Sequence, residues 1–166
     1  MKRIFSICFL ITFALFFIGS SLQAQIGKRF LSERKEIKDP VTGNKLIFLT
    51  STPAGDSKIY QTHNQWTSDG KWLIFRSGRV KGEAMAVNEK TGDMVQVSEG
   101  GYSGMLNVAR KSMKLYFMRK LGTDSINSSL SIIEVDLAKL FADSKARTLK
   151  PATAYQRVCG ITPPEL

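Results

Sequence analysis

The stretch Gln65-Trp66-Thr67-Ser68-Asp69-Gly70-Lys71-Trp72-Leu73-Ile74-Phe75-Arg76-Ser77 decides the fold class of this chain. It joins a short inner strand to a second strand rich in β-forming residues. The connection is an Asp-Gly dipeptide, which favours a tight hairpin turn. From Asp39 onward the chain continues as short apolar runs separated by turn residues, and a helical period is found near 137–144. The pattern predicts an all-β protein.

The hairpin pattern recurs 42 residues further on, where Leu115-Tyr116-Phe117 matches Leu73-Ile74-Phe75 and Val108 matches Trp66. A second echo is offset by 49 residues, because 42–48 and 91–97 each consist of a Thr-Gly turn followed by a strand. Repeats of about 40 residues with four short strands each are typical of β-propeller blades. A β-sandwich with turns at similar spacing is the alternative.

The sequence predicts about two four-stranded blades plus a lone outer strand. The first blade would consist of 63–66, 71–76, 83–88 and 94–97, and the second of 104–109, 114–118, 129–136 and 146–149. Residues 45–49 would form the lone outer strand, and 151–166 would open a third blade. A closed ring of four blades needs about 160 residues, more than are left once the N-terminal segment is set aside. We therefore expect a partial propeller, a fragment of a larger ring.

The N-terminus has the organisation of a secretory signal peptide. Lys2 and Arg3 precede an apolar run over 4–18, and small residues lead to Ala24 before Gln25. A membrane anchor is the alternative, but the run is short for a spanning helix. We expect an exported protein, periplasmic or secreted, with no stable membrane span after cleavage. The expected parts are a signal peptide (1–24), a charged leader (25–38) and an incomplete propeller domain (39–166).

Charge and cysteine content restrict the partners. The net charge is +10, and loss of Lys2 and Arg3 leaves +8, which favours an acidic partner. Export argues against nucleic acid and in favour of an acidic polysaccharide. Cys8 leaves with the signal peptide, so Cys159 has no intrachain disulfide partner.

Several stretches resemble the oligogalacturonate lyases, seven-bladed propellers that cleave short pectin fragments. The Ser-Asp-Gly-Lys and Thr-Gly elements are shared with the wider class of TolB-like, WD40-like propellers. The order of an outer strand followed by 60–66 is the more particular match. The resembling stretches are Asp39–Thr50, Lys58–Ser77, Gly82–Gly100 and Leu115–Met118.

The resemblance implies β-elimination of acidic pectin oligosaccharides, in which a base removes a proton and a metal stabilises the developing charge. It also implies a manganese site built from several histidines and a glutamine in later blades. His63 is the single histidine of this chain, so we expect no metal or cofactor here and identify no catalytic residue. We expect the N-terminal part of such a lyase, inactive alone. A TolB-like binding or scaffolding module of the cell envelope is the alternative.

Candidate substrate-binding residues follow from the blade geometry, because alternate connections share one face of a propeller. This places Gln61, His63, Arg76, Arg79 and Arg119 on one face. Arginine suits uronate carboxylates because its planar fork donates two parallel hydrogen bonds. Solvated loop cations and a structural histidine are the competing interpretations. Open blade edges also predict self-association or assembly with other chains.

Overall fold

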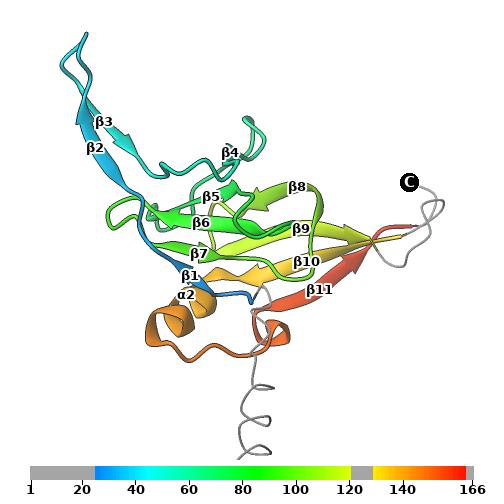
Figure 1. Cartoon of the computed structure of the whole chain (residues 1–166). Helices are drawn as coiled ribbons and strands as arrows, with labels where there is room; N and C mark the ends of the chain where they lie inside the picture. The colour runs from blue at the N-terminus through cyan, green and yellow to red at the C-terminus, as the bar shows by residue number, and fades with distance from the viewer. Residues whose placement is uncertain (1–24, 121–128, 164–166) are drawn as a thin grey trace, which may run out of the picture.

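The computed structural model describes residues 25–120 and 129–163 (Figure 1). The predicted signal peptide lies outside the described residues. One α-helix, α2 (Leu137–Ala146), and a short 3₁₀ helix, η1 (Ala152–Ala154), accompany the strands in these ranges. The strands are β1 (Arg29–Phe30), β2 (Lys35–Lys38), β3 (Lys45–Phe48), β4 (Ser57–Lys58), β5 (Trp72–Arg76), β6 (Ala84–Asn88), β7 (Met94–Gln96), β8 (Ser103–Val108), β9 (Lys114–Lys120), β10 (Leu130–Asp136) and β11 (Gln156–Ile161).

The described strands form three antiparallel sheets. The first has the order β1-β7-β6-β5-β4, the second has the order β11-β10-β9-β8, and β2 pairs with β3 alone. Figure 1 shows the first two sheets stacked, with α2 beside them and the β2–β3 hairpin projecting away. The predicted fold class is confirmed, because the two larger sheets correspond to two successive blades of an open propeller.

The main core lies between the two larger sheets. Alternate residues of β5 and β6 meet alternate residues of β9 and β10, as the two-residue period of strands requires. Ile74 and Ala86 from the first sheet and Leu115 and Phe117 from the second belong to one buried cluster, which Leu140 of α2 completes. The opposite face of the first sheet is also covered, because Phe75, Met85, Val87 and Met94 are buried there.

The predicted repeat with an offset of 42 residues is confirmed at the turn end of each blade. Trp66 bridges Leu73, and Val108 pairs with Leu115, so the same pair recurs at the predicted offset. The predicted inner strand 63–66 is wrong in extent, because β4 lies earlier and is separated from Trp66 by an irregular segment.

The predicted last strand of the second blade, 146–149, is also wrong. Helix α2 extends through Ala146 and is capped by the Asp136 side chain, which accepts from the Lys139 N–H. The fourth strand is β11, which pairs with β10. The segment expected to open a third blade therefore completes the second.

The charged leader expected over 25–38 contains the strands β1 and β2. Ile26 is fully buried, and β1 adds a fifth strand to the outer edge of the first sheet by pairing with β7. The predicted outer strand over 45–49 is not alone, because β3 pairs with β2 along its whole length.

A substitution at Gly27 tests the packing of the segment that leads into β1. Its φ is +88°, and an added Cβ would lie 2.3 Å from Leu149 Cδ2. We expect Gly27→Ala to lower the free energy of unfolding by about 2 kcal/mol, since it combines left-handed backbone strain with overpacking. Gly55→Ala is the matched control: its φ is +68° with no atom within 4 Å of the added Cβ, so about 1 kcal/mol is expected. Urea unfolding of both variants measures the difference, and equal losses would contradict the described packing.

Candidate functional site

The inner edge of the first blade is interrupted by a large bulge. Ser57 and Lys58 pair with Arg76 and Phe75, and the ladder resumes where the Ile74 N–H donates to the Gln65 carbonyl at 2.9 Å. Residues 59–64 therefore bulge out of the strand. Bulges at barrel rims and blade edges redirect side chains and are common beside binding sites.

The bulge begins at a buried residue and carries polar and aromatic side chains. Ile59 is buried, whereas Tyr60 and Gln61 are exposed. The His63 N–H donates to the Tyr60 carbonyl at 3.0 Å, and the two rings meet edge to face with centroids 5.4 Å apart. The Nδ1 atom of His63 is buried and has no hydrogen-bond partner among the described groups.

Two side chains link this edge to β8, the inner strand of the second blade. The Asn64 amide donates to the Trp66 carbonyl at 2.6 Å and to the Val108 carbonyl at 3.4 Å. Arg76 donates through Nη2 to the Gly104 carbonyl at 3.4 Å, while its buried Nε has no described partner. Buried polar atoms are nearly always paired in folded proteins. The Nε–H group of Arg76 can therefore donate one further hydrogen bond, and the Nδ1 atom of His63 can form one further hydrogen bond.

Tyr102 lies in the electrostatic field of Arg76. Burial raises the pKa of its hydroxyl, and the positive charge of Arg76 partly opposes that rise. The phenol therefore stays protonated at neutral pH and can donate a hydrogen bond to an anionic ligand.

Arg79 is held inside the chain rather than presented on a binding face. Its side chain is 8% exposed and forms ion pairs with Glu33, at 2.7 Å, and with Asp56. Although burial alone would raise the pKa of Glu33, hydrogen bonds from Arg79 and from the Ser51 and Thr52 backbone lower it to about 2. Through Glu33 and Asp56, Arg79 therefore connects the segments at residues 33, 51–52 and 56 to the first blade.

Arg119 also has internal partners. Its Nε donates to the Gly101 carbonyl at 3.0 Å, and its Nη2 donates to the Glu99 carbonyl. Both bonds hold the connection between β7 and β8. Of the five sequence candidates, Gln61 and His63 lie on the bulge at the inner edge of the first blade, and Arg76 ends the adjacent strand β5. Arg79 and Arg119 instead bind internal loop groups.

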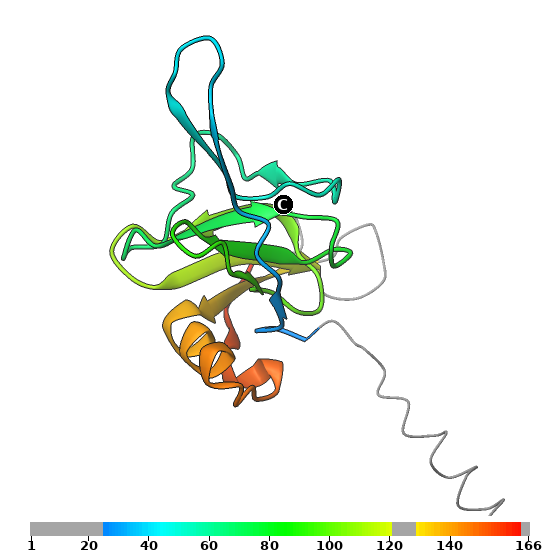
Figure 2. The ribbon, with the colours of Figure 1, turned by 60° about the vertical axis from the view of Figure 1, so that its left-hand side comes forward.

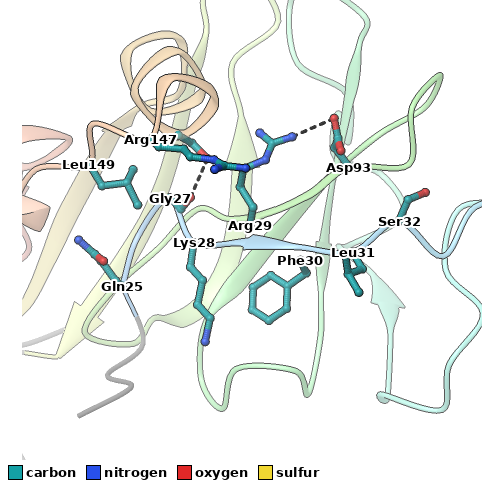
Figure 3. Close-up of a pocket in the computed structure, with 11 residues that line it drawn as sticks. Gln25, Gly27, Lys28, Arg29, Phe30, Leu31, Ser32, Asp93, Arg147 and Leu149 are labelled. Atoms are coloured by element: carbon teal, nitrogen blue, oxygen red, sulfur yellow. Dashed lines mark hydrogen bonds and ion pairs between the residues drawn. The ribbon is translucent and has the colours of Figure 1, made fainter. Parts of the chain in front are cut away.

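A basic groove of about 690 Å³ lies beside β1, and the sequence analysis did not identify it as a site (Figure 3). Arg29 forms an ion pair with Asp93 at 2.9 Å, and Lys28 lies 5.4 Å from the centroid of the Phe30 ring. Arg147 lines the same groove and is the one non-glycine residue with positive φ in the described ranges. In the sequence, Lys28 and Arg29 stand out only as part of the charged leader.

The described residues do not suit a manganese ion. No group of three or more His, Cys, Asp or Glu side chains converges anywhere in 25–120 or 129–163. Within these same ranges, no helix combines the length and the apolarity needed to span a membrane.

The two stacked antiparallel blades define part of a β-propeller. Comparison with solved structures identifies proteins that share this fold. The chain is similar to an oligogalacturonate lyase in complex with manganese, with a TM-score of 0.56 and 20% identity over 70% of this chain and 30% of that chain. It is also similar to the oligogalacturonate lyase of Vibrio parahaemolyticus, with a TM-score of 0.57 and 18% identity over 81% of this chain and 31% of that chain.

These likenesses confirm the structural resemblance predicted from the sequence. At such identities they establish the shared fold, and the chain spans about a third of the length of the two lyases. No protein-family model and no curated protein matches the chain.

The Arg79 ion pairs predict a pH-dependent loss of stability. We expect Arg79→Met to lower the free energy of unfolding by about 2 kcal/mol at pH 7, because it leaves two partly buried carboxylates without a cation. The lowered pKa of Glu33 contributes stability that is complete above its ordinary value of 4.5 and is lost as pH falls toward 2. The gap between variant and parent should therefore narrow below pH 4.5.

Chemical denaturation at pH 7 and pH 3 measures this gap. Lys71→Met is the matched control, since Lys71 forms an exposed pair with Asp69 at 3.7 Å and should change stability by at most about 0.5 kcal/mol. A pH-independent loss in Arg79→Met would exclude the ionic contribution.

Proposed function

We propose that this chain is the N-terminal part of an exported, oligogalacturonate lyase-like propeller that binds acidic pectin oligosaccharides and is inactive alone. The observation that carries the proposal is the inner edge of the first blade. There, the stretch that most resembles the lyases forms a bulge, in which His63 has a buried nitrogen without a described partner. Arg76, at the end of the adjacent strand β5, has another. The fold shared with two oligogalacturonate lyases supports the same substrate class.

The chemistry of the edge suits a uronate. The Arg76 guanidinium can donate to a carboxylate, and charge-assisted bonds of this kind are about twice as strong as neutral ones. Tyr60 and Gln61 are exposed on the 59–64 bulge and offer an aromatic ring and an amide for sugar hydroxyls. The basic composition of the chain adds long-range attraction to a polyanion.

The proposal that the chain is inactive alone is supported by the chemistry that turnover needs. β-Elimination needs a base positioned at the acidic carbon and a stabiliser for the carboxylate. With one histidine in the sequence and no converging ligand set in the described ranges, we assign binding rather than catalysis to this chain.

Binding should depend on the inner edge. We expect Arg76→Met to raise the dissociation constant for a short oligogalacturonate by about tenfold, because it removes one charge-assisted contact. His63→Ala should weaken binding as well. Isothermal titration calorimetry with the purified chain measures both effects.

Arg110→Met is the matched control, since it removes the same charge from an exposed position in the β8–β9 connection. Its affinity should equal that of the parent. If the chain instead retains a protein partner from envelope extract and has no affinity for oligogalacturonate, the TolB-like binding or scaffolding function is favoured.

Export is tested by the fate of the N-terminal segment. Expressed with its first 24 residues, the chain should be recovered outside the cytoplasm with Gln25 as its first residue, as intact-mass measurement would reveal. Ala24→Leu should block cleavage because signal peptidase requires a small residue there. A cytoplasmic chain retaining Met1 would refute the proposed export.

A further inference from the structure

The β2–β3 hairpin has the same turn as the β6–β7 hairpin of the first blade. In both, the first side chain accepts two backbone bonds: Asp39 from Val41 and Thr42, and Asn88 from Lys90 and Thr91. The closing backbone bonds also coincide, because the Asp39 N–H donates to Asn44 at 2.7 Å and the Asn88 N–H donates to Asp93 at 2.9 Å. The hairpin is therefore equivalent to the outer two strands of a blade.

The two hairpins differ in what lies beside them. In the first blade the inner edge of β6 pairs with β5, whereas no described strand pairs with the corresponding edge of β2. Figures 1 and 2 both show β2 and β3 extending away from the stacked sheets. The base is nevertheless held firmly, because Glu33 accepts from Ser51 at 2.9 Å and pairs with Arg79.

One face of the hairpin carries three exposed apolar side chains and one lysine. The register pairs Ile37 with Leu46 and Lys35 with Phe48, which places these four residues on one face. Ile37 and Phe48 are each 46% exposed, and Leu46 is 38% exposed. The opposite face carries the ion pair between Glu36 and Lys45, at 3.0 Å. An exposed apolar row next to an open strand edge is a surface for strand addition.

The charges along β2 are complementary to themselves. The order Lys35-Glu36-Ile37-Lys38 in β2, followed by Asp39 at the start of the turn, reads as positive, negative, apolar, positive, negative. When two such strands run antiparallel with Ile37 opposite Ile37, Lys35 faces Asp39 and Glu36 faces Lys38, each twice by symmetry. Every charged cross-strand pair is then attractive, which stabilises antiparallel pairing.

The backbone N–H and C=O groups at the free edge of β2 point in the directions that this register requires. The Asp39 N–H points toward β3, where it bonds to Asn44. Because backbone direction alternates along a strand, the N–H and C=O groups of Glu36 and Lys38 point toward the free edge. In the antiparallel register about Ile37, those two residues face each other and satisfy one another's groups.

We propose that the free edge of β2 pairs antiparallel with β2 of a second copy of this chain, centred on Ile37. The product is a four-stranded sheet of order β3-β2-β2-β3, the strand number of a blade, with Leu46-Ile37-Ile37-Leu46 as one apolar row across it. The interface is isologous, so it closes as a dimer.

The composition of β2 favours a second copy over a pair of strands from a further blade. At the equivalent positions, β6 carries Ala84-Met85-Ala86-Val87, which are buried because the second sheet covers one face of that blade and side chains such as Phe30 and Leu49 cover the other. The Lys35-Glu36-Ile37-Lys38 sequence of β2 has charges on both faces. It suits a sheet with solvent on both sides, and burying its charges between blades would be costly.

Sedimentation velocity of the purified full chain over a range of concentrations tests the proposal. The parent should shift from monomer to dimer mass. Glu36→Lys or Lys38→Glu alone should each raise the dimer dissociation constant at least about tenfold, because two attractive pairs become repulsive. Lys90→Glu, a charge reversal in the equivalent turn of the β6–β7 hairpin, is the matched control and should dimerise like the parent.

Mixing the two single variants distinguishes pairing from loss of the hairpin fold. An equimolar mixture of Glu36→Lys and Lys38→Glu chains again places opposite charges across the edge, so mixed dimers should form with near-parental affinity. The proposal is overturned by a monomer at every concentration, by a dimer that is unaffected by either single variant, or by a mixture that stays monomeric.

Discussion

The apolar contact between the two larger sheets is the interaction on which the other features depend. A four-stranded sheet has two faces, and burying apolar area is the main source of stability available without disulfides. Ile74 and Ala86 on one side and Leu115 and Phe117 on the other close that contact, and α2 extends it through Leu140. The inner edges of both blades are thereby brought together, which allows Asn64 and Arg76 to reach the carbonyls of β8.

The sequence determines the hairpins better than it determines what joins them. The Asp-Gly turn, the offset of 42 residues and the Thr-Gly turns predicted the positions of β5, β6, β7 and β9, because these strands combine strong β propensity with local turn chemistry. β11 was missed because Gln156–Ile161 has little apolar alternation and is placed by pairing with β10, a contact made over a long separation in sequence.

The residues of the candidate site also differ in how far the sequence predicts their roles. His63 and Gln61 were identifiable because polar residues crowd a segment that should be an inner strand. Arg79 was not separable from them by sequence, since its two carboxylate partners, Glu33 and Asp56, come from segments that the fold alone brings to it. The sequence pattern predicts which charged residues share a face, but the ion-pair partner of each one depends on tertiary contacts.

The matching turns after β2 and β6 also bear on how such a chain is assembled in evolution. The two outer hairpins have the same turn hydrogen bonds at a spacing of 49 residues, and the two inner hairpins recur at a spacing of 42 residues. The two spacings can differ because the connections and the 59–64 bulge lie outside the ladders. The turn and strand residues of a hairpin are sufficient to fix its pairing, so the connections beside it can change in length and sequence. New ligand contacts can therefore arise in the connections of this architecture without loss of strand pairing.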